Sequence, residues 1–214
     1  MKKSKITRTR AVKESDKSAK KSQLIKHAAN LLHKREFTDL SMEEVAQSAQ
    51  IAKGTLYLYF QTKEELYLEV LKKDYEEWFK ALNDFLIKSK TIDKKIFIRW
   101  LLNSLKERPR FLKMLPMSAT ILEQNVSESC ITEYKKLLSS LLTTASVSLC
   151  SALHLKSPAE ALHLLLQFHI AAVGAWSLGF PNPQVQSVIK NHRLRIFDLD
   201  YFDTLEKILL KLAE

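Results

Sequence analysis

The titratable side chains of this chain are not spaced for metal binding or catalysis. His163 and His169 lie six residues apart, about 240° around a helix, so they cannot share a metal ion as an i, i+4 pair can. His27 and His33 have the same separation. Adjacent acidic residues point in different directions on a helix and are typical of a solvated face; the pairs are Glu43–Glu44, Glu64–Glu65 and Glu76–Glu77.

Covalent and phosphate chemistry are equally unsupported. Three glycines in the whole chain are too few to build a Gly-rich phosphate loop. No nucleophile has a credible neighbouring base. We therefore expect no catalytic residue, no metal and no cofactor, which indicates that the protein is not an enzyme.

A different chemistry, the binding of a polyanion, is available between residues 41 and 63. Lys53 and Lys63 flank one short segment and can neutralise phosphates. The backbone N–H groups after Ser41 present a helix N-terminus, which favours an anion. These three positions predict contacts that orient a nucleic acid without reading its sequence.

The residues between the two lysines can contact bases. Gly54 allows close backbone approach, Thr55 and Tyr59 can form hydrogen bonds, and an exposed Leu58 can meet a thymine methyl group. Taken singly, each position has an ordinary explanation, because a tyrosine is often a core aromatic and a lysine is often a solvated charge. The surrounding pattern of elements favours DNA contact.

The elements that position these residues are short helices. Apolar residues at i, i+3, i+4 and i+7 spacing predict a first helix over residues 21–34. Ser41 followed by Glu44 is a capping-box signature that begins a two-turn second helix. Residues 52–60 can form a third helix. Three short helices with a tight turn between the second and third are typical of a helix-turn-helix.

Longer helices account for the remainder. Thr62 and Glu65 begin a helix that runs to about Lys88, on the order of 40 Å. Further breaks are expected at Arg108–Pro109, at Pro116, at 125–127 and at 156–158, and no strand pattern competes. The helix that begins at Pro158 ends near Gly179, and a last amphipathic helix follows Asp200.

Residues 24–66 closely resemble the DNA-binding domain of the TetR family. The residues that carry the resemblance are Ala28–Ala29, Phe37, Ser41, Val45–Ala46, Lys53–Gly54–Thr55–Leu56–Tyr57, Phe60, Lys63–Glu64 and Leu66. Two departures are visible: Glu36 replaces a glycine, and Gln50–Ile51–Ala52 replaces the usual glycine, apolar residue and serine at the turn. A left-handed backbone at a non-glycine residue costs about 1 kcal/mol.

The resemblance implies an all-α protein with a three-helix head over residues 22–66 and a helical bundle body over 67–214 for ligand binding and dimerisation. It also implies a third helix in the major groove, with the Tyr57 hydroxyl on a phosphate. Such a protein is a DNA-binding transcriptional regulator, commonly a repressor, that binds a palindromic double-stranded DNA operator as a homodimer. A small apolar or amphipathic effector, unknown here, releases it.

Two further sets of residues follow from this reading. Candidate ligand-binding residues in the body are Trp100, Phe111, Met114, Met117, Leu122, Phe168 and Trp176, although aromatic and Met residues at helical spacing are often plain core. Small residues allow another helix to approach closely, either in a core or between subunits. The candidate dimer-interface residues are Ala171, Ala172, Ala175, Leu205 and Leu209.

Charge leaves one alternative open. Residues 1–21 hold nine Lys or Arg against two acids, so seven of the ten net positive charges lie there, and a flexible tail is expected. The tail either aids solubility or lies along DNA. A rival is a helical adaptor or membrane-surface protein that uses this tail on anionic lipid. Two cysteines without metal spacing, no secretory signal and no uninterrupted apolar span predict a cytoplasmic protein that does not cross a membrane.

Overall fold

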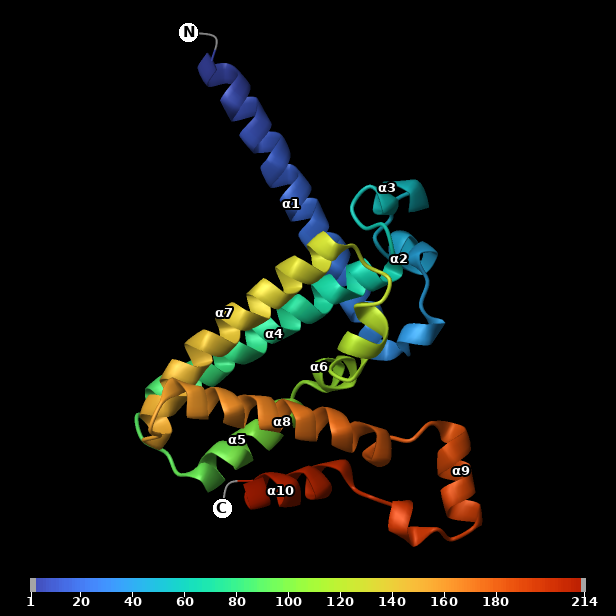
Figure 1. Ribbon diagram of the computed structural model, residues 1–214. Coiled ribbons are helices and arrows are strands. Elements are labelled where there is room, and N and C mark those ends of the chain that lie inside the picture. The colour runs from blue at the N-terminus through green and yellow to red at the C-terminus, as the bar shows by residue number, and fades with distance from the viewer. Residues whose placement is uncertain (1–2, 213–214) are drawn as a thin grey trace. The chain divides into compact units, whose positions relative to one another are not determined.

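A computed structural model describes residues 3–212, with side chains described from residue 16 onward, and all regular elements in that part are helical (Figure 1). The all-α prediction is confirmed. The helices are α1 (Lys3–Lys34), η1 (Phe37–Asp39), α2 (Met42–Ser48), α3 (Lys53–Tyr57), α4 (Lys63–Ser89), α5 (Lys94–Lys106), α6 (Pro109–Met114), η2 (Ser118–Leu122), α7 (Glu128–Leu153), α8 (Pro158–Gly179), α9 (Pro183–Asn191), η3 (Arg195–Phe197) and α10 (Tyr201–Leu212).

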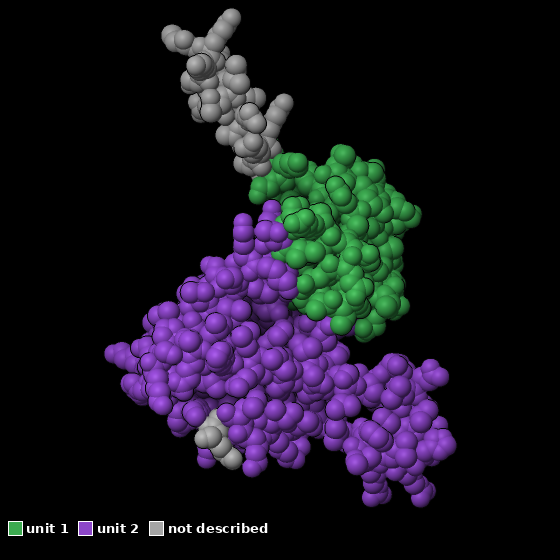
Figure 2. Space-filling view, viewed as in Figure 1, with its two compact units in different colours: residues 1–73, 118–131 green, residues 74–117, 132–214 purple. Residues whose placement is uncertain are grey.

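The chain forms two compact units (Figure 2). Unit 1 comprises residues 1–73 and 118–131, and unit 2 comprises residues 74–117 and 132–214. Unit 1 contains the whole expected head, together with a later segment that the sequence analysis did not assign to it. The residues of α4 and α7 are divided between the two units.

The core of unit 1 joins the first four helices. Leu24 and Ala28 of α1, Leu56 of α3 and Leu66 of α4 are fully buried, and so is Phe60, which follows α3. The ring of Phe37 meets that of Tyr67 edge to face, with centroids 5.3 Å apart. Because α3 is only five residues long, it depends on this packing rather than on its own helix propensity.

The start of α1 differs from the expectation. The first helix begins at Lys3 and not near residue 21, so the basic segment is helical and not a separate coil. Residues 3–20 contain neither glycine nor proline and are rich in lysine and arginine. Extending a helix that is already fixed by buried residues costs little compared with nucleating one, which explains the added turns.

Left-handed backbone occurs at non-glycine residues that follow helices. Gln50 has φ 53°, and the Ile51 N–H donates to Ala46 O at 3.0 Å while the Gln50 N–H donates to Gln47 O at 3.0 Å. This is a Schellman ending of α2, so the strain expected at Gln50 is present. At Glu36, φ is −75°, which any residue adopts, and the cost expected there does not arise.

Unit 2 is built around α5, α8 and α10. The α10 helix packs on both of the others, and the Tyr201 hydroxyl donates to Ala172 O at 3.1 Å in a buried contact. A Cβ atom added to Gly179 would lie 2.6 Å from the Tyr201 Cβ, so glycine is needed where α8 and α10 meet. The bond from Arg110 Nε to Asp74 Oδ2, 3.0 Å long, ties α6 to α4.

Two helices of the described residues, α7 and α8, are long and apolar enough to cross a membrane by length and composition alone. Core helices of globular proteins pass the same test. Each of the two buries one face within the protein, and the buried residues of α8 include Leu165 and Phe168. Burial covers only 22 % of the apolar window in α7 and 28 % in α8, and one or two such helices are weak evidence for a membrane span.

Candidate nucleic-acid interface and ligand cavity

The α3 helix presents a solvent-exposed face from a fixed base. Leu56 and Phe60 are fully buried, whereas Leu58 is 77 % exposed and Tyr57 is 44 % exposed. Gly54 is exposed, and nothing lies within 4 Å of the position where its Cβ would be. The orientation predicted for α3 from helical periodicity is confirmed. Thr55 and Tyr59 are half-buried at its edges.

The capping box expected before α2 is present. Ser41 Oγ accepts a hydrogen bond from the Glu44 N–H at 3.3 Å, and the Glu44 carboxylate accepts one from the Ser41 N–H at 2.9 Å. The Arg35 guanidinium also bonds Glu44 and, with Ser41, lowers the pKa of this carboxyl. The exposed cation Lys53 lies 3.5 Å from Glu43. Ser41 and Lys53 therefore stand at the surface near the N-termini of α2 and α3.

Lys63 has a role that sequence reasoning missed. Its Nζ donates to Phe37 O and to Leu40 O, both at 3.0 Å, and lies 4.0 Å from the centre of the Phe37 ring. The ammonium holds the chain that leads into α2 and is not a freely solvated charge. Its spacing in the sequence gives no sign of these carbonyl partners, because they come from a loop 23 to 26 residues earlier.

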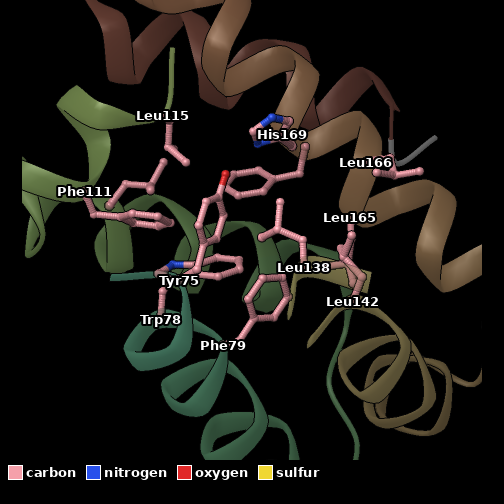
Figure 3. A pocket seen from close by; sticks show the side chains of 12 residues that line it. Tyr75, Trp78, Phe79, Phe111, Leu115, Leu138, Leu142, Leu165, Leu166 and His169 are labelled. Carbon is pink, nitrogen blue, oxygen red and sulfur yellow. The ribbon is translucent and has the colours of Figure 1, made fainter. Parts of the chain in front are cut away.

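Unit 2 contains an apolar cavity between its helices. It encloses about 190 Å³. In Figure 3 the aromatic rings of α4 and α6 point into it, with His169 of α8 at its edge. The lining residues are Tyr75, Trp78, Phe79, Leu105, Phe111, Leu115, Leu138, Leu142, Leu165, Leu166, Phe168 and His169.

Polar groups are few along this lining. The Trp78 Nε1 donates to Ser104 Oγ at 2.9 Å, so that group is already satisfied. Burial lowers the pKa of His169, and the positive charge of Lys135 lowers it further. The imidazole is therefore neutral at pH 7. It can offer a hydrogen bond to the polar end of a mostly apolar molecule.

Of the ligand-binding residues expected from sequence, only Phe111 and Phe168 line this cavity. Trp100 stacks on Phe85 with centroids 5.0 Å apart, and Trp176 packs against Phe180 and Tyr201. The remaining three, Met114, Met117 and Leu122, are not among the lining residues, and Leu122 belongs to unit 1. Residue type and helical spacing do not tell which side of a buried helix borders empty space.

The expected dimer-interface residues lie mostly inside the chain. Ala172 and Ala175 of α8 are buried, as are Leu205 and Leu209 of α10, and Ala171 is half-buried. The small residues of α8 serve its packing against α10, which leaves little surface for a partner. The exposed stripe of α8 instead carries Leu166, Ile170, Gly174, Ser177 and Leu178.

Comparison with known families agrees with the helix-turn-helix geometry. Residues 24–70 match the family model described as bacterial regulatory proteins, tetR family. Residues 72–214 match the tetracyclin repressor-like C-terminal domain. The chain belongs to the TetR family. It is thus a DNA-binding transcriptional regulator, and neither matched model describes an enzyme. The membrane-surface alternative depends on residues 1–21, which lie outside both matched ranges.

Solved structures share the TetR fold with low sequence identity. The fatty acid degradation regulator FadR from Bacillus halodurans is 15 % identical, with a TM-score of 0.54 over 91 % of this chain and 94 % of that chain. The FadR of Thermus thermophilus, solved with lauroyl-CoA, is 17 % identical, with a TM-score of 0.56 over 90 % and 92 %. The FadR of Bacillus subtilis, solved with stearoyl-CoA, is 13 % identical, with a TM-score of 0.53 over 90 % and 97 %. A comparison with curated proteins found no match.

Proposed function

We propose that this protein is a cytoplasmic repressor that binds a palindromic operator as a homodimer and is released by a small apolar or amphipathic effector. The observation that carries the DNA-binding part is the exposed face of α3. Gly54 and Leu58 point away from the unit 1 core, and Lys53 stands at the start of that helix. The surface also includes Ser41, Thr55, Tyr57 and Tyr59. Lys63 supports it indirectly, because its ammonium holds the chain that leads into α2.

The cavity favours a compact effector. An apolar cavity of about 150 Å³ holds benzene, whereas pockets for drug-sized ligands measure about 300 Å³ or more. At about 190 Å³, the space in unit 2 suits a small aromatic or short-chain molecule with one polar group near His169. The acyl-CoA ligands of two FadR neighbours raise a second candidate class, but a long acyl chain would require these helices to separate.

A short stretch of the chain links the wall of the cavity to the helix-turn-helix head. Phe111 and Leu115 line the cavity, and three residues further along the chain Ser118 begins η2, which belongs to unit 1. Within unit 1 the Thr62 hydroxyl donates to Asn125 O at 2.9 Å. Thr62 directly precedes α4 and accepts a bond from the Glu65 N–H. A ligand that displaces α6 would therefore pull on the segment that fixes the start of α4.

The DNA-binding proposal is tested by selecting genomic fragments with the purified protein at physiological salt. Enrichment of a palindromic site is expected, because two heads read two half-sites. Lys53→Ala should then lower the salt slope of operator binding by about one unit. Lys80→Ala, which removes an exposed lysine of unit 2 paired with Asp84, should leave the slope unchanged. Selection of no sequence at all would contradict operator recognition.

The effector proposal is tested by titrating candidate ligands of the unit 2 cavity into the protein, with and without operator DNA. Coupling between two sites is reciprocal, so an inducer that weakens DNA binding must itself bind less tightly to the DNA complex. A coupling of about 1 to 3 kcal/mol is typical. Tryptophan fluorescence can follow binding through Trp78, which lines the cavity. Lauroyl-CoA and a small aromatic acid are the two probes, and equal affinity in both titrations would exclude that compound as an inducer.

A further inference from the structure

Residues 180–200 form an excursion in which only Phe180, at its base, has a ring contact with core aromatics, Trp176 and Tyr201. The excursion leaves at Gly179 and returns at Tyr201, where the two residues are in direct contact. Between these points lie α9 and η3, and no residue from 180 to 200 is buried. Figure 1 shows α9 apart from α8 and α10, and in Figure 2 this segment projects from unit 2. We call residues 180–200 the arm.

The arm is nevertheless rich in apolar side chains. Ile196 is 79 % exposed and Phe197 is 50 % exposed. On α9, Val185, Val188 and Ile189 follow the i, i+3, i+4 spacing of an apolar helix face. A nine-residue helix is marginal in water and normally depends on packing of that face. An exposed apolar surface of this kind marks an interaction site.

The arm borders an apolar groove that continues onto the exposed stripe of α8. The groove encloses about 570 Å³. Ser177 and Leu178 form its α8 side, and Val185, Val188, Leu194 and Phe197 are among the residues that form its arm side. The groove therefore meets the stripe at the C-terminal end of α8, at Ser177 and Leu178.

We infer that the occupant of this groove is a second copy of the same chain, so that each arm of the proposed homodimer packs against the partner subunit. The inference rests on the proposed homodimer. The α8 stripe alone offers three large apolar side chains, and the arm supplies seven more. A stable interface needs about 20 to 30 residues from each subunit, which the stripe cannot provide without the arm.

A two-fold axis that passes close to Gly174 would bring the groove within reach of the partner subunit. Gly174 is exposed, with open space at its missing Cβ, so two α8 helices can approach closely there. A two-fold axis at Gly174 pairs each residue with the one equally distant on the other side. With that axis, Ile170 of one subunit would face Leu178 of the other at the edge of the groove.

The test uses the full-length protein with a charge placed on the arm. Ile196→Asp buries an unpaired carboxylate if the arm contacts a partner, and we expect the dimer dissociation constant to rise at least tenfold. Ser187→Asp, on the polar side of α9, is the matched control and should change it less than twofold. Analytical ultracentrifugation measures both values, and circular dichroism checks that helical content is kept.

A photo-crosslinker identifies the surface that the arm touches. Benzoylphenylalanine in place of Ile196, in a mixture of two differently tagged copies, should give a crosslink that joins both tags and maps to the α8 region. An intrachain crosslink, or an unchanged dissociation constant for Ile196→Asp, would overturn the arm contact while leaving the dimer intact. A wild-type chain that stays monomeric at all concentrations would overturn the proposed homodimer itself.

Discussion

The short helices α3 and α9 both have most of their residues exposed, but for opposite reasons. In α3, Leu56 is fully buried and fixes the helix on the unit 1 core, and Lys53, Gly54 and Tyr57 face solvent. In α9 no residue is buried, and the exposed face holds Val185 and Val188. The exposed surface of α3 therefore suits a polar partner such as DNA. The apolar face of α9 instead needs an apolar partner.

This contrast separates two ways of making a binding surface. A surface held by its own core keeps its shape before the partner arrives, which lowers the cost of binding. A surface with no core of its own gains its packing only in the complex, and the stability of the complex then depends on protein concentration. Substitutions in the head and in the arm can test this difference.

The largest effect is expected from removing the anchor of α3. Leu56→Ala should lower the free energy of unfolding by roughly 2 to 5 kcal/mol, because it deletes a fully buried side chain. Val188→Ala in the arm should cost little in dilute protein and more at concentrations where the chain dimerises. Urea denaturation at two protein concentrations measures both. A large cost for Val188→Ala in the monomer would show that the arm packs within its own chain.

A smaller effect is expected at the base of the arm. Gly179→Ala places a Cβ about 2.6 Å from the Tyr201 Cβ, and such overpacking costs roughly 1 to 3 kcal/mol. Gly174→Ala in the same helix meets nothing within 4 Å and should stabilise the monomer by about 0.5 to 1 kcal/mol through helix propensity. Thermal unfolding compares the two variants, and a stable Gly179→Ala protein would contradict the close contact of α8 with α10.

The head and the arm can also be compared by removing a left-handed non-glycine residue from each. Gln50 ends α2 with φ 53° and Arg193 follows α9 with φ 54°. Glycine removes the cost of a left-handed backbone, about 1 kcal/mol. Gln50→Gly should therefore raise global stability by up to about 1 kcal/mol. Arg193→Gly should slow hydrogen exchange in α9 alone. Equal global stabilisation by both would mean that the arm unfolds together with the core.

The smallest expected effect appears only in acid. Because burial lowers the pKa of His169 in the folded protein, the unfolded chain, with an ordinary pKa near 6.5, takes up a proton first. The stability contributed by neutral His169 is complete above that pH and falls as the pH drops below it. His169→Gln should flatten this part of the stability curve. An unchanged curve would place the acid sensitivity elsewhere in the body.

The sequence by itself determined the helical class and the head. Breakers at Pro109 and Pro158 placed helix boundaries correctly, and the spacing of Leu56, Phe60 and Leu58 predicted which side of α3 faces solvent. These features are local, because a capping residue or a helical period acts over a few positions. The high charge of residues 1–21 predicts a flexible tail, whereas the structure has a helix from Lys3 onward.

Only the tertiary structure decided what lies between the helices. The partners of Lys63, the cavity beside His169 and the contact of Gly179 with Tyr201 join residues far apart in the chain. The helix α8 is apolar on nearly all sides, so its sequence cannot tell the side that packs on α10 from the side that borders a cavity or remains exposed. That choice depends on which helix covers which face, and packing between distant segments sets it.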